Sequence, residues 1–206
     1  MVTKCKLAIF DMDGVLVNTA DIHTEALRKS IASLVSIEAS QERFLDAHDG
    51  IRTKDKLKRL AASYGLSDTE VKAIDVLKEK LTMEDLERLP TNLMLVETLT
   101  ELKRKGIKLS IGSNSRRSYV NAIIKAIGIE PLLDYSVAGD EIDNPKPHPE
   151  VFKRSMEYFD HSADETVIFE DSAIGIEAAA RTGSIVIIVD PSSGVTKEQL
   201  LFCVNR

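Results

Sequence analysis

The 206-residue sequence contains few cysteines, no long apolar run and no excess of positive charge. Its two cysteines lie at opposite ends of the chain, so they supply neither a disulfide framework nor a zinc site, and a reducing compartment is expected. No stretch approaches the ~20 consecutive apolar residues of a membrane-spanning helix. The apolar run near the N-terminus is too short for a secretory signal. We therefore predict a soluble, cytoplasmic protein with no membrane partner.

The charge balance limits the ligands that the protein can take. The formal net charge of -6 argues against a nucleic-acid partner held by bulk positive charge. A small anionic substrate is compatible with it, since a bound cation can reverse the local field. Hydrophobic residues make up 43% of the chain, enough for one or two compact domains with an ample core. The sequence does not fix the oligomeric state, and a monomer is compatible with it.

Short apolar runs alternate with amphipathic helical patterns along most of the chain. The runs are rich in β-branched residues and nearly continuous, as in parallel strands that are buried on both faces. They occupy residues 5–10, 107–112, 135–138, 166–169 and 184–189. Two of the helical patterns between them end at Gly106 and Gly128. This alternation predicts an α/β fold with a Rossmann-like parallel sheet core flanked by helices.

One stretch breaks this alternation, because residues 17–90 show helical patterns and no strand pattern. Two helices are predicted around residues 22–34 and 57–64. A third follows Ser67, whose spacing to Glu70 is that of a capping box. We predict that residues 1–16 and 91–206 form the α/β core. Residues 17–90 are predicted to form a small, all-helical cap domain inserted after the first strand.

Polar side chains gather where four of the predicted strands end. Asp11 and Asp13 follow the first strand, and residues two apart in an extended chain point to the same side. Two like charges there are costly unless a positive group binds them. The other groups are Ser113 with Asn114, Lys146 in a proline-rich loop, and Glu170 with Asp171. If the strands are parallel, all these groups open onto the edge of the sheet where α/β proteins bind ligands.

The residue types in this set indicate phosphoryl chemistry. The four acidic side chains offer the hard oxygen ligands that Mg²⁺ prefers. Lys146 can orient a carboxylate and a phosphate oxygen together, while Ser113 and Asn114 at a helix start can hold other phosphate oxygens. Attack by a carboxylate on such a phosphoryl group gives an aspartyl phosphate, which water hydrolyses. Taken singly, the same residues are also compatible with a solvated loop, a helix cap or a surface turn.

The chain resembles the haloacid dehalogenase superfamily, in its phosphatase-like branch with a helical cap. Four motifs carry the resemblance, in the family's order and over nearly the whole chain: Asp11-x-Asp13-Gly14-Val15, Ser113-Asn114, Lys146-Pro147-x-Pro149 and Glu170-Asp171-Ser172. The resemblance implies that Asp11 is the nucleophile and a metal ligand. It implies that Asp13 gives Mg²⁺ its backbone carbonyl and acts as general acid and base. Ser113 and Lys146 then bind the phosphoryl group, and Glu170 and Asp171 complete the metal site.

Further candidates for substrate contacts lie outside these motifs. Arg116 is a candidate for phosphate binding, because arginine pairs well with phosphate. His23 stands where sugar-phosphate phosphatases and β-phosphoglucomutase often carry a histidine, near the cap hinge. Arg52 and Lys80 are cap residues that could reach the leaving group, although charged cap residues are mostly solvated.

These observations together predict a Mg²⁺-dependent phosphatase that acts on a small phosphorylated metabolite, by preference a sugar phosphate. The main alternative is a phosphomutase of the β-phosphoglucomutase type. Against it, Thr53 stands at the place of that enzyme's phosphate-binding arginine, with Arg52 one residue off. Two alternatives belong to other classes, a phosphoacceptor signalling domain of the receiver type and a catalytically inactive binding relative. The helical insertion and the late Glu170-Asp171 pair argue against the first, and the complete motifs against the second.

Overall fold

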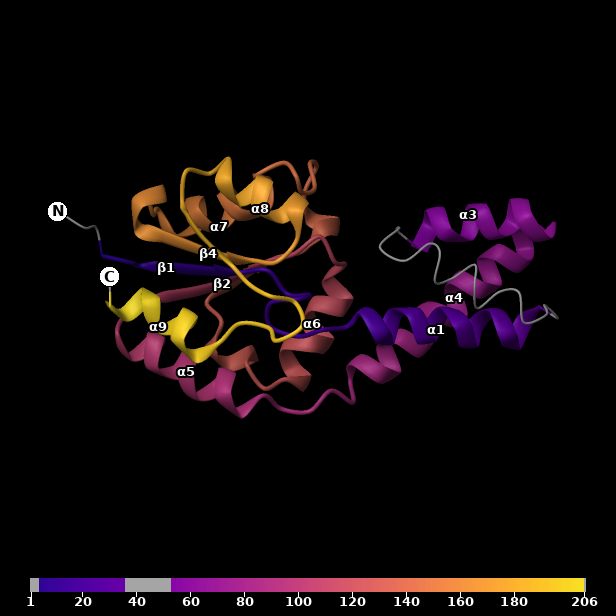
Figure 1. Cartoon of the computed structure of the whole chain (residues 1–206), viewed down its shortest axis with the longest axis horizontal. Helices are drawn as coiled ribbons and strands as arrows, with labels where there is room; N and C mark the ends of the chain where they lie inside the picture. Colours follow the sequence, from indigo (N-terminus) through magenta and orange to yellow (C-terminus); the bar gives the residue numbers. More distant parts are fainter. Residues whose placement is uncertain (1–3, 36–52, 206) are drawn as a thin grey trace. The chain divides into compact units, whose positions relative to one another are not determined.

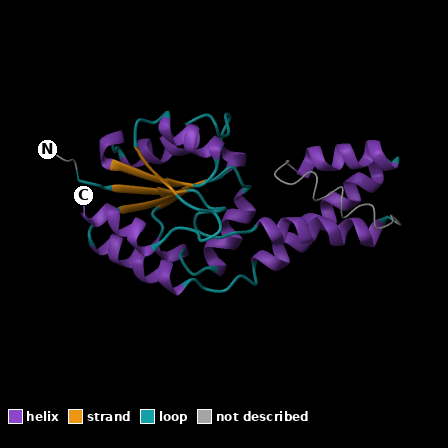
Figure 2. Cartoon of the chain, in the orientation of Figure 1, coloured by secondary structure: helices purple, strands orange, loops and turns teal. Residues whose placement is uncertain are grey.

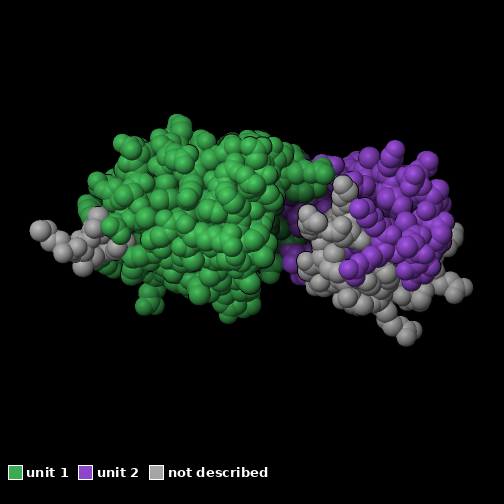
Figure 3. All heavy atoms as spheres, turned by 90° about the horizontal axis from the view of Figure 1, so that it is seen from above, with its two compact units in different colours: residues 1–19, 87–206 green, residues 20–86 purple. Residues whose placement is uncertain are grey.

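The structure is a computed structural model that describes residues 4–35 and 53–205. It divides into two compact units, Met1–Thr19 with Glu87–Arg206 as unit 1 and Ala20–Leu86 as unit 2 (Figure 3). Arg52, one of the predicted cap residues, lies outside the described residues. Every helix in the described ranges is too short or too polar to cross a membrane.

A parallel sheet forms the centre of unit 1, with the strand order β3-β2-β1-β4-β5 in the part of the chain that is described. The strands are β1 (Leu7–Phe10), β2 (Lys108–Gly112), β3 (Tyr135–Val137), β4 (Thr166–Glu170) and β5 (Ile185–Ile188). All four pairings are parallel, and Phe10 of β1 is aligned with Ile111 on one side and Phe169 on the other. The predicted α/β fold is confirmed, and each predicted apolar run overlaps a strand.

The prediction that the strands are buried on both faces is right for the inner strands and wrong for the edges. All residues of β1 and β4 are buried, whereas β5 is only partly covered and Ile188 is 62% exposed. Among the described strands, β3 and β5 each have a partner on one side only, because they lie at the two ends of the sheet. An apolar run therefore indicates a strand without showing its place in the sheet.

Helices cover both faces of this sheet (Figures 1 and 2). They are α5 (Leu93–Arg104), α6 (Arg117–Ala126), α7 (Glu150–Phe159), α8 (Ala173–Ala180) and α9 (Lys197–Asn205), with short 3₁₀ turns at Glu130–Leu132, Gly139–Glu141 and Ala163–Glu165. Leu7 and Ile9 of β1 pack with Phe152 of α7 and Ala178 of α8 in one buried cluster. This packing holds α7 and α8 over one face, with α5 and α9 drawn on the other (Figure 1).

The secondary structure in the described residues of unit 2 is all helical. It contains α1 (Ala20–Leu34), α3 (Thr53–Tyr64) and α4 (Asp68–Leu86). Its core is an apolar cluster contributed by all three helices: Leu27, Ile31, Leu57, Leu60 and Ile74. The predicted capping box is present, since Glu70 accepts from the backbone of Ser67 at 2.8 Å and Ser67 Oγ accepts from the backbone of Glu70 at 3.3 Å.

Asp134 fixes the start of the β2–β3 pairing. Its carboxylate accepts from the backbone N–H of Leu109 at 3.0 Å and from Lys103 Nζ at 2.9 Å. Burial acts against the charge of Asp134, but these bonds outweigh burial and lower the pKa below its ordinary value of 3.8. The charged carboxylate therefore favours the folded state.

Replacement of Asp134 by alanine leaves the Leu109 N–H without its acceptor. We expect Asp134→Ala to lower the free energy of unfolding by about 1–3 kcal/mol in urea titrations at pH 7. The contribution of the charge is present above the unfolded pKa and is lost as the pH falls through the lower folded pKa, so the difference from wild type should narrow below pH 3.8. Asp143→Ala, at an exposed carboxylate, is the control and should change stability by less than ~0.5 kcal/mol. Equal effects of the two variants would contradict this role of Asp134.

Candidate active site

The predicted residues that follow β1, β2 and β4 lie at the adjacent ends of these central strands. β1 has β2 on one side and β4 on the other, so the carboxyl ends of these three strands lie next to one another. Asp11 follows β1 and its backbone N–H donates to the carbonyl of Phe169 in β4 at 2.9 Å. Glu170 is the last residue of β4, and Ser113 follows β2. The strand order thus explains why residues more than a hundred positions apart in the sequence are neighbours.

Lys146 lies between two carboxylates that are largely removed from solvent. Its Nζ is 2.5 Å from Asp11 Oδ1 and 2.5 Å from Glu170 Oε1. The exposed fractions of the Lys146, Asp11 and Glu170 side chains are 3%, 11% and 0%. The ring of Phe152 lies beside the ammonium, with its centroid 4.7 Å from Nζ. Because both carboxylates share one cation, the position of Lys146 determines the electrostatics of the site.

The pKa values of these groups follow from burial and from the shared cation. Burial raises the pKa of Asp11 to about 7, although the Lys146 ammonium acts in the opposite direction. Burial alone would lower the pKa of Lys146, but the carboxylates of Asp11 and Glu170 raise it above its ordinary value. Burial and the nearby Glu170 also raise the pKa of Asp171. Three carboxyl groups thus lie together beside Lys146, and a cluster of this kind favours the binding of a further cation.

The loop that carries Lys146 is held at both of its sides. The backbone N–H of Lys146 donates to Oδ1 of Asn114 at 3.1 Å. Glu150, the first residue of α7, accepts from the backbone of Asp143 at 3.2 Å and from that of Asn144 at 3.0 Å. The side chain of Asn144 adds a third bond, and together these bonds lower the pKa of Glu150 to about 2. The peptide bond from Lys146 to Pro147 is cis.

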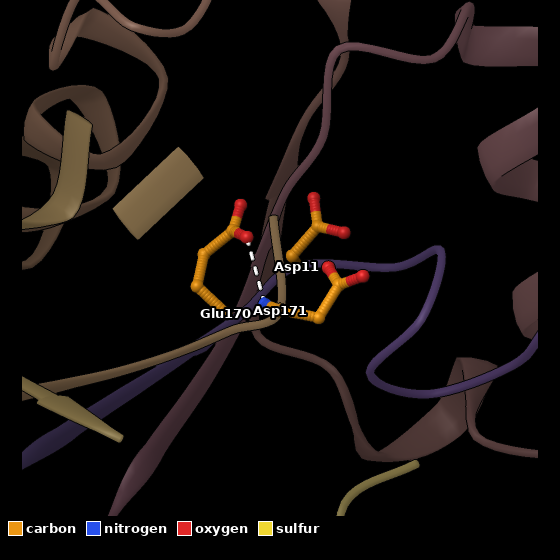
Figure 4. A group of neighbouring side chains, drawn as sticks. All are labelled: Asp11, Glu170 and Asp171. Carbon is orange, nitrogen blue, oxygen red and sulfur yellow. Dashed lines mark hydrogen bonds between the residues drawn. The ribbon is translucent and has the colours of Figure 1, made fainter. Parts of the chain in front are cut away.

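Three carboxylates form a cluster that could hold a metal ion. Asp11, Glu170 and Asp171 each offer one oxygen, and these oxygens all lie within 4.8 Å of one another (Figure 4). Gly14 leaves room for this arrangement, because a Cβ at its position would lie 2.1 Å from Asp171 Oδ2. Gly14 also has a φ of +79°, which glycine adopts without strain. An all-oxygen donor set of this kind suits Mg²⁺.

Asp13 is held by two hydroxyl groups that were not among the predicted site residues. The hydroxyl of Thr19 donates to Asp13 Oδ1, and the hydroxyl of Ser115 donates to Asp13 Oδ2 at 3.2 Å. Thr19 is 2% exposed. Ser115 directly follows the predicted Ser113-Asn114 motif, and this position could have indicated it as a site residue. Nothing in the sequence singles out Thr19.

The other predicted residues have varied surroundings. Ser113 is buried and its Oγ accepts from the backbone of Ser115 at 3.1 Å, while Arg116 is the exposed N-cap residue of α6. In unit 2, His23 Nδ1 lies 3.1 Å from Nζ of the buried Lys78. The side chain of Lys80 is 71% exposed and lies 3.9 Å from Glu84. The structure thus joins His23 to Lys78, another lysine of α4, and places Lys80 on the solvent side of that helix.

Comparison with known proteins gives the family. The sequence pattern of the haloacid dehalogenase-like hydrolases matches residues 8–189, and the chain therefore belongs to this family. The phosphorylated carbohydrates phosphatase of Thermotoga maritima is 29% identical over 177 residues, which make up 85% of this chain and 80% of that protein. Protein CbbY of Rhodobacter capsulatus is 26% identical over an alignment of 198 positions that covers 92% of this chain and 86% of that protein.

A solved structure agrees with these relatives. A Thermotoga maritima protein, provisionally assigned as a beta-phosphoglucomutase, matches with a TM-score of 0.74 at 25% identity, covering 97% of this chain and 98% of that one. The predicted family and enzyme class, a haloacid dehalogenase-like phosphoric monoester hydrolase, are thereby confirmed.

The shared lysine gives a direct test of the site's electrostatics. Replacement of Lys146 by methionine leaves two carboxylates, Asp11 and Glu170, without their buried cation. We expect Lys146→Met to lower the free energy of unfolding by about 3–5 kcal/mol, measured by urea denaturation in the absence of divalent metal. Lys153→Met makes the same change at an exposed position of α7 and should cost less than ~0.5 kcal/mol. If Lys146→Met loses no more stability than Lys153→Met, the contacts of Lys146 with Asp11 and Glu170 do not stabilise the fold.

Proposed function

We propose that the protein is a Mg²⁺-dependent phosphatase that hydrolyses a small phosphomonoester through an aspartyl-phosphate intermediate, with a sugar phosphate as the preferred substrate. One observation carries the proposal. Asp11 lies at the carboxyl end of the central strand β1, where its Oδ1 is 2.5 Å from Lys146 Nζ and the Asp171 carboxylate lies close by. A buried carboxylate beside an ammonium group and two further acidic side chains supports the proposed role of Asp11 as nucleophile, with a cation and metal ligands nearby.

Two steps follow from the proposed roles. In the first, an Asp11 oxygen attacks phosphorus, the bond from phosphorus to the leaving oxygen breaks, and Asp13 gives that oxygen a proton. In the second, Asp13 takes a proton from water as the water oxygen attacks phosphorus, and the bond from Asp11 to phosphorus breaks. The hydroxyls of Thr19 and Ser115 hold the Asp13 carboxylate in one orientation for both proton transfers.

The acidic cluster fits the proposed metal. Asp11, Asp171 and Glu170 are the side chains that would hold it, with the backbone carbonyl of Asp13 as a further ligand. The oxygens of Glu170 already accept from Lys146 and from backbone N–H groups, so Asp11 and Asp171 have the more available lone pairs. A bound Mg²⁺ would neutralise charge on the phosphoryl oxygens. Ser113 and Lys146 are proposed to bind those oxygens as well, with Asn114 fixing the lysine loop.

Unit 2 is proposed to act as the cap that excludes water during transfer and selects the leaving group. His23 is the candidate within it for substrate contact, together with the buried Lys78 at 3.1 Å. The preference for sugar phosphates is supported by the relative that acts on phosphorylated carbohydrates.

A phosphomutase is the second candidate, because the similarity to the provisionally assigned beta-phosphoglucomutase covers 97% of this chain. It would pass the phosphoryl group from Asp11 to a second sugar position instead of to water. Incubation with β-glucose 1-phosphate and a bisphosphate primer separates the two functions. Free phosphate supports the phosphatase, and glucose 6-phosphate supports the mutase.

Asp11→Asn tests the nucleophile. The amide keeps the size of the side chain but cannot form the intermediate, so phosphate release from p-nitrophenyl phosphate and a panel of sugar phosphates should fall by at least about 10³-fold. Circular dichroism should show an unchanged fold. Asp143→Asn, at an exposed position, should keep wild-type activity. Near-normal turnover by Asp11→Asn would rule out the proposed mechanism.

Metal removal tests the cofactor. Chelation with EDTA followed by dialysis should abolish phosphate release, and added Mg²⁺ should restore it. Asp171→Asn removes one charged ligand, so the Mg²⁺ concentration for half-maximal activity should rise at least about tenfold. The Asp143→Asn control should leave that concentration unchanged. Full activity of the dialysed enzyme, or an unchanged Mg²⁺ requirement in Asp171→Asn, would contradict the assignment.

A further inference from the structure

The side chain of Glu170 folds back over the first turn of α8. Its Oε2 accepts from the backbone N–H groups of Asp171 at 2.9 Å and Ser172 at 3.0 Å, and from the Ser172 hydroxyl at 3.1 Å. Its Oε1 accepts from Lys146 Nζ at 2.5 Å. The carboxylate thus lies at the N-terminal end of a helix, where a negative charge is favoured. It links the backbone of this turn to the lysine that contacts Asp11.

Gly175 provides the space for this carboxylate. It is the third residue of α8, and its backbone N–H donates to the capping hydroxyl of Ser172 at 3.2 Å. A Cβ at this position would lie 1.9 Å from Oε1 and 2.1 Å from Cδ of Glu170. These distances are well inside van der Waals contact, so any larger side chain would displace the carboxylate. Glycine is a poor helix former, and nothing in the local helix geometry calls for it here.

We propose that Gly175 is a positioning residue for the reaction, because it alone leaves room for Glu170 to hold Lys146 against Asp11. The expected effect of Gly175 on catalysis rests on the proposed function, whereas its effect on the packing of Glu170 does not. Glu170 is completely buried, its carbonyl accepts from the backbone N–H of Val189 at 2.8 Å, and β4 is paired with β1 up to the preceding Phe169, so its backbone has little room to move. A methyl group at position 175 would therefore move the side chain and, with it, the Lys146 ammonium.

A double-mutant cycle in thermal unfolding tests the packing without any need for activity. Alanine is a better helix former than glycine, so Gly175→Ala would raise the midpoint of thermal unfolding if no side chain occupied the space beside position 175. We expect it instead to lower the midpoint by several degrees. In the Glu170→Ala background, where the carboxylate is gone, the same change should be neutral or stabilising. An equal loss in both backgrounds would overturn the inference. Should Glu170→Ala fail to fold, the shorter Glu170→Asp serves as the background.

Steady-state kinetics tests the positioning. A displacement of about 1 Å in a catalytic group can cost roughly 10²-fold, so Gly175→Ala should lower kcat for p-nitrophenyl phosphate by that order while KM changes less. Glu170→Asp shortens the acid by one methylene and so leaves more room for a methyl group at position 175. The double variant Glu170→Asp/Gly175→Ala should therefore have a higher kcat than Gly175→Ala. Ile174→Ala, at the neighbouring exposed position of α8, should stay within about twofold of wild type.

The outcomes separate the two claims. Normal kcat in Gly175→Ala, or no recovery in Glu170→Asp/Gly175→Ala, would overturn the positioning role while leaving the phosphatase proposal intact. A wild-type enzyme that releases phosphate from none of the substrates would remove the proposed function, and the thermal cycle would then decide the inference by itself.

Discussion

The constraint on which the rest of the site depends is a single buried ammonium shared by two carboxylates. Lys146 contacts Asp11 and Glu170 at 2.5 Å each, in surroundings that exclude most solvent. Buried charges are costly unless they are paired, and the lysine is the buried partner of both carboxylates. Because the pair lies at the strand ends of β1 and β4, the same contact joins the chemistry of the site to the order of the strands in the sheet.

Other features of unit 1 serve this contact. Asn114 and Glu150 hold the lysine loop, and Phe152 lies beside the ammonium. Gly14 and Gly175 leave room for the Asp171 and Glu170 side chains. The result is a fixed acidic cluster that favours a divalent cation, next to a lysine suited to a phosphoryl group. The site is thus formed by tight packing around charged groups.

Much of this could be predicted from the sequence. The strand runs are short, β-branched and apolar, so the parallel sheet followed from the pattern, and the motif around Asp11 and Asp13 indicated the chemistry. The strand order could not be predicted, because it depends on which strands pair. The same limit applies to Thr19, whose hydroxyl reaches Asp13 only in the folded turn, and to Gly175, whose purpose is the space beside Glu170. The exposure of Lys80 could not be predicted either, because a lysine in a predicted cap helix has the same sequence whether it is exposed or buried.

The proposed mechanism requires Asp11 to accept the phosphoryl group. Rapid acid quench of the enzyme during turnover of p-nitrophenyl phosphate with Mg²⁺, followed by mass spectrometry of the peptide that contains Asp11, detects such an adduct. We expect a phosphoryl group on the Asp11 carboxylate that is present during turnover and disappears when the substrate is exhausted. Phosphate release with the label on another residue, or with no covalent adduct at any quench time, would contradict it.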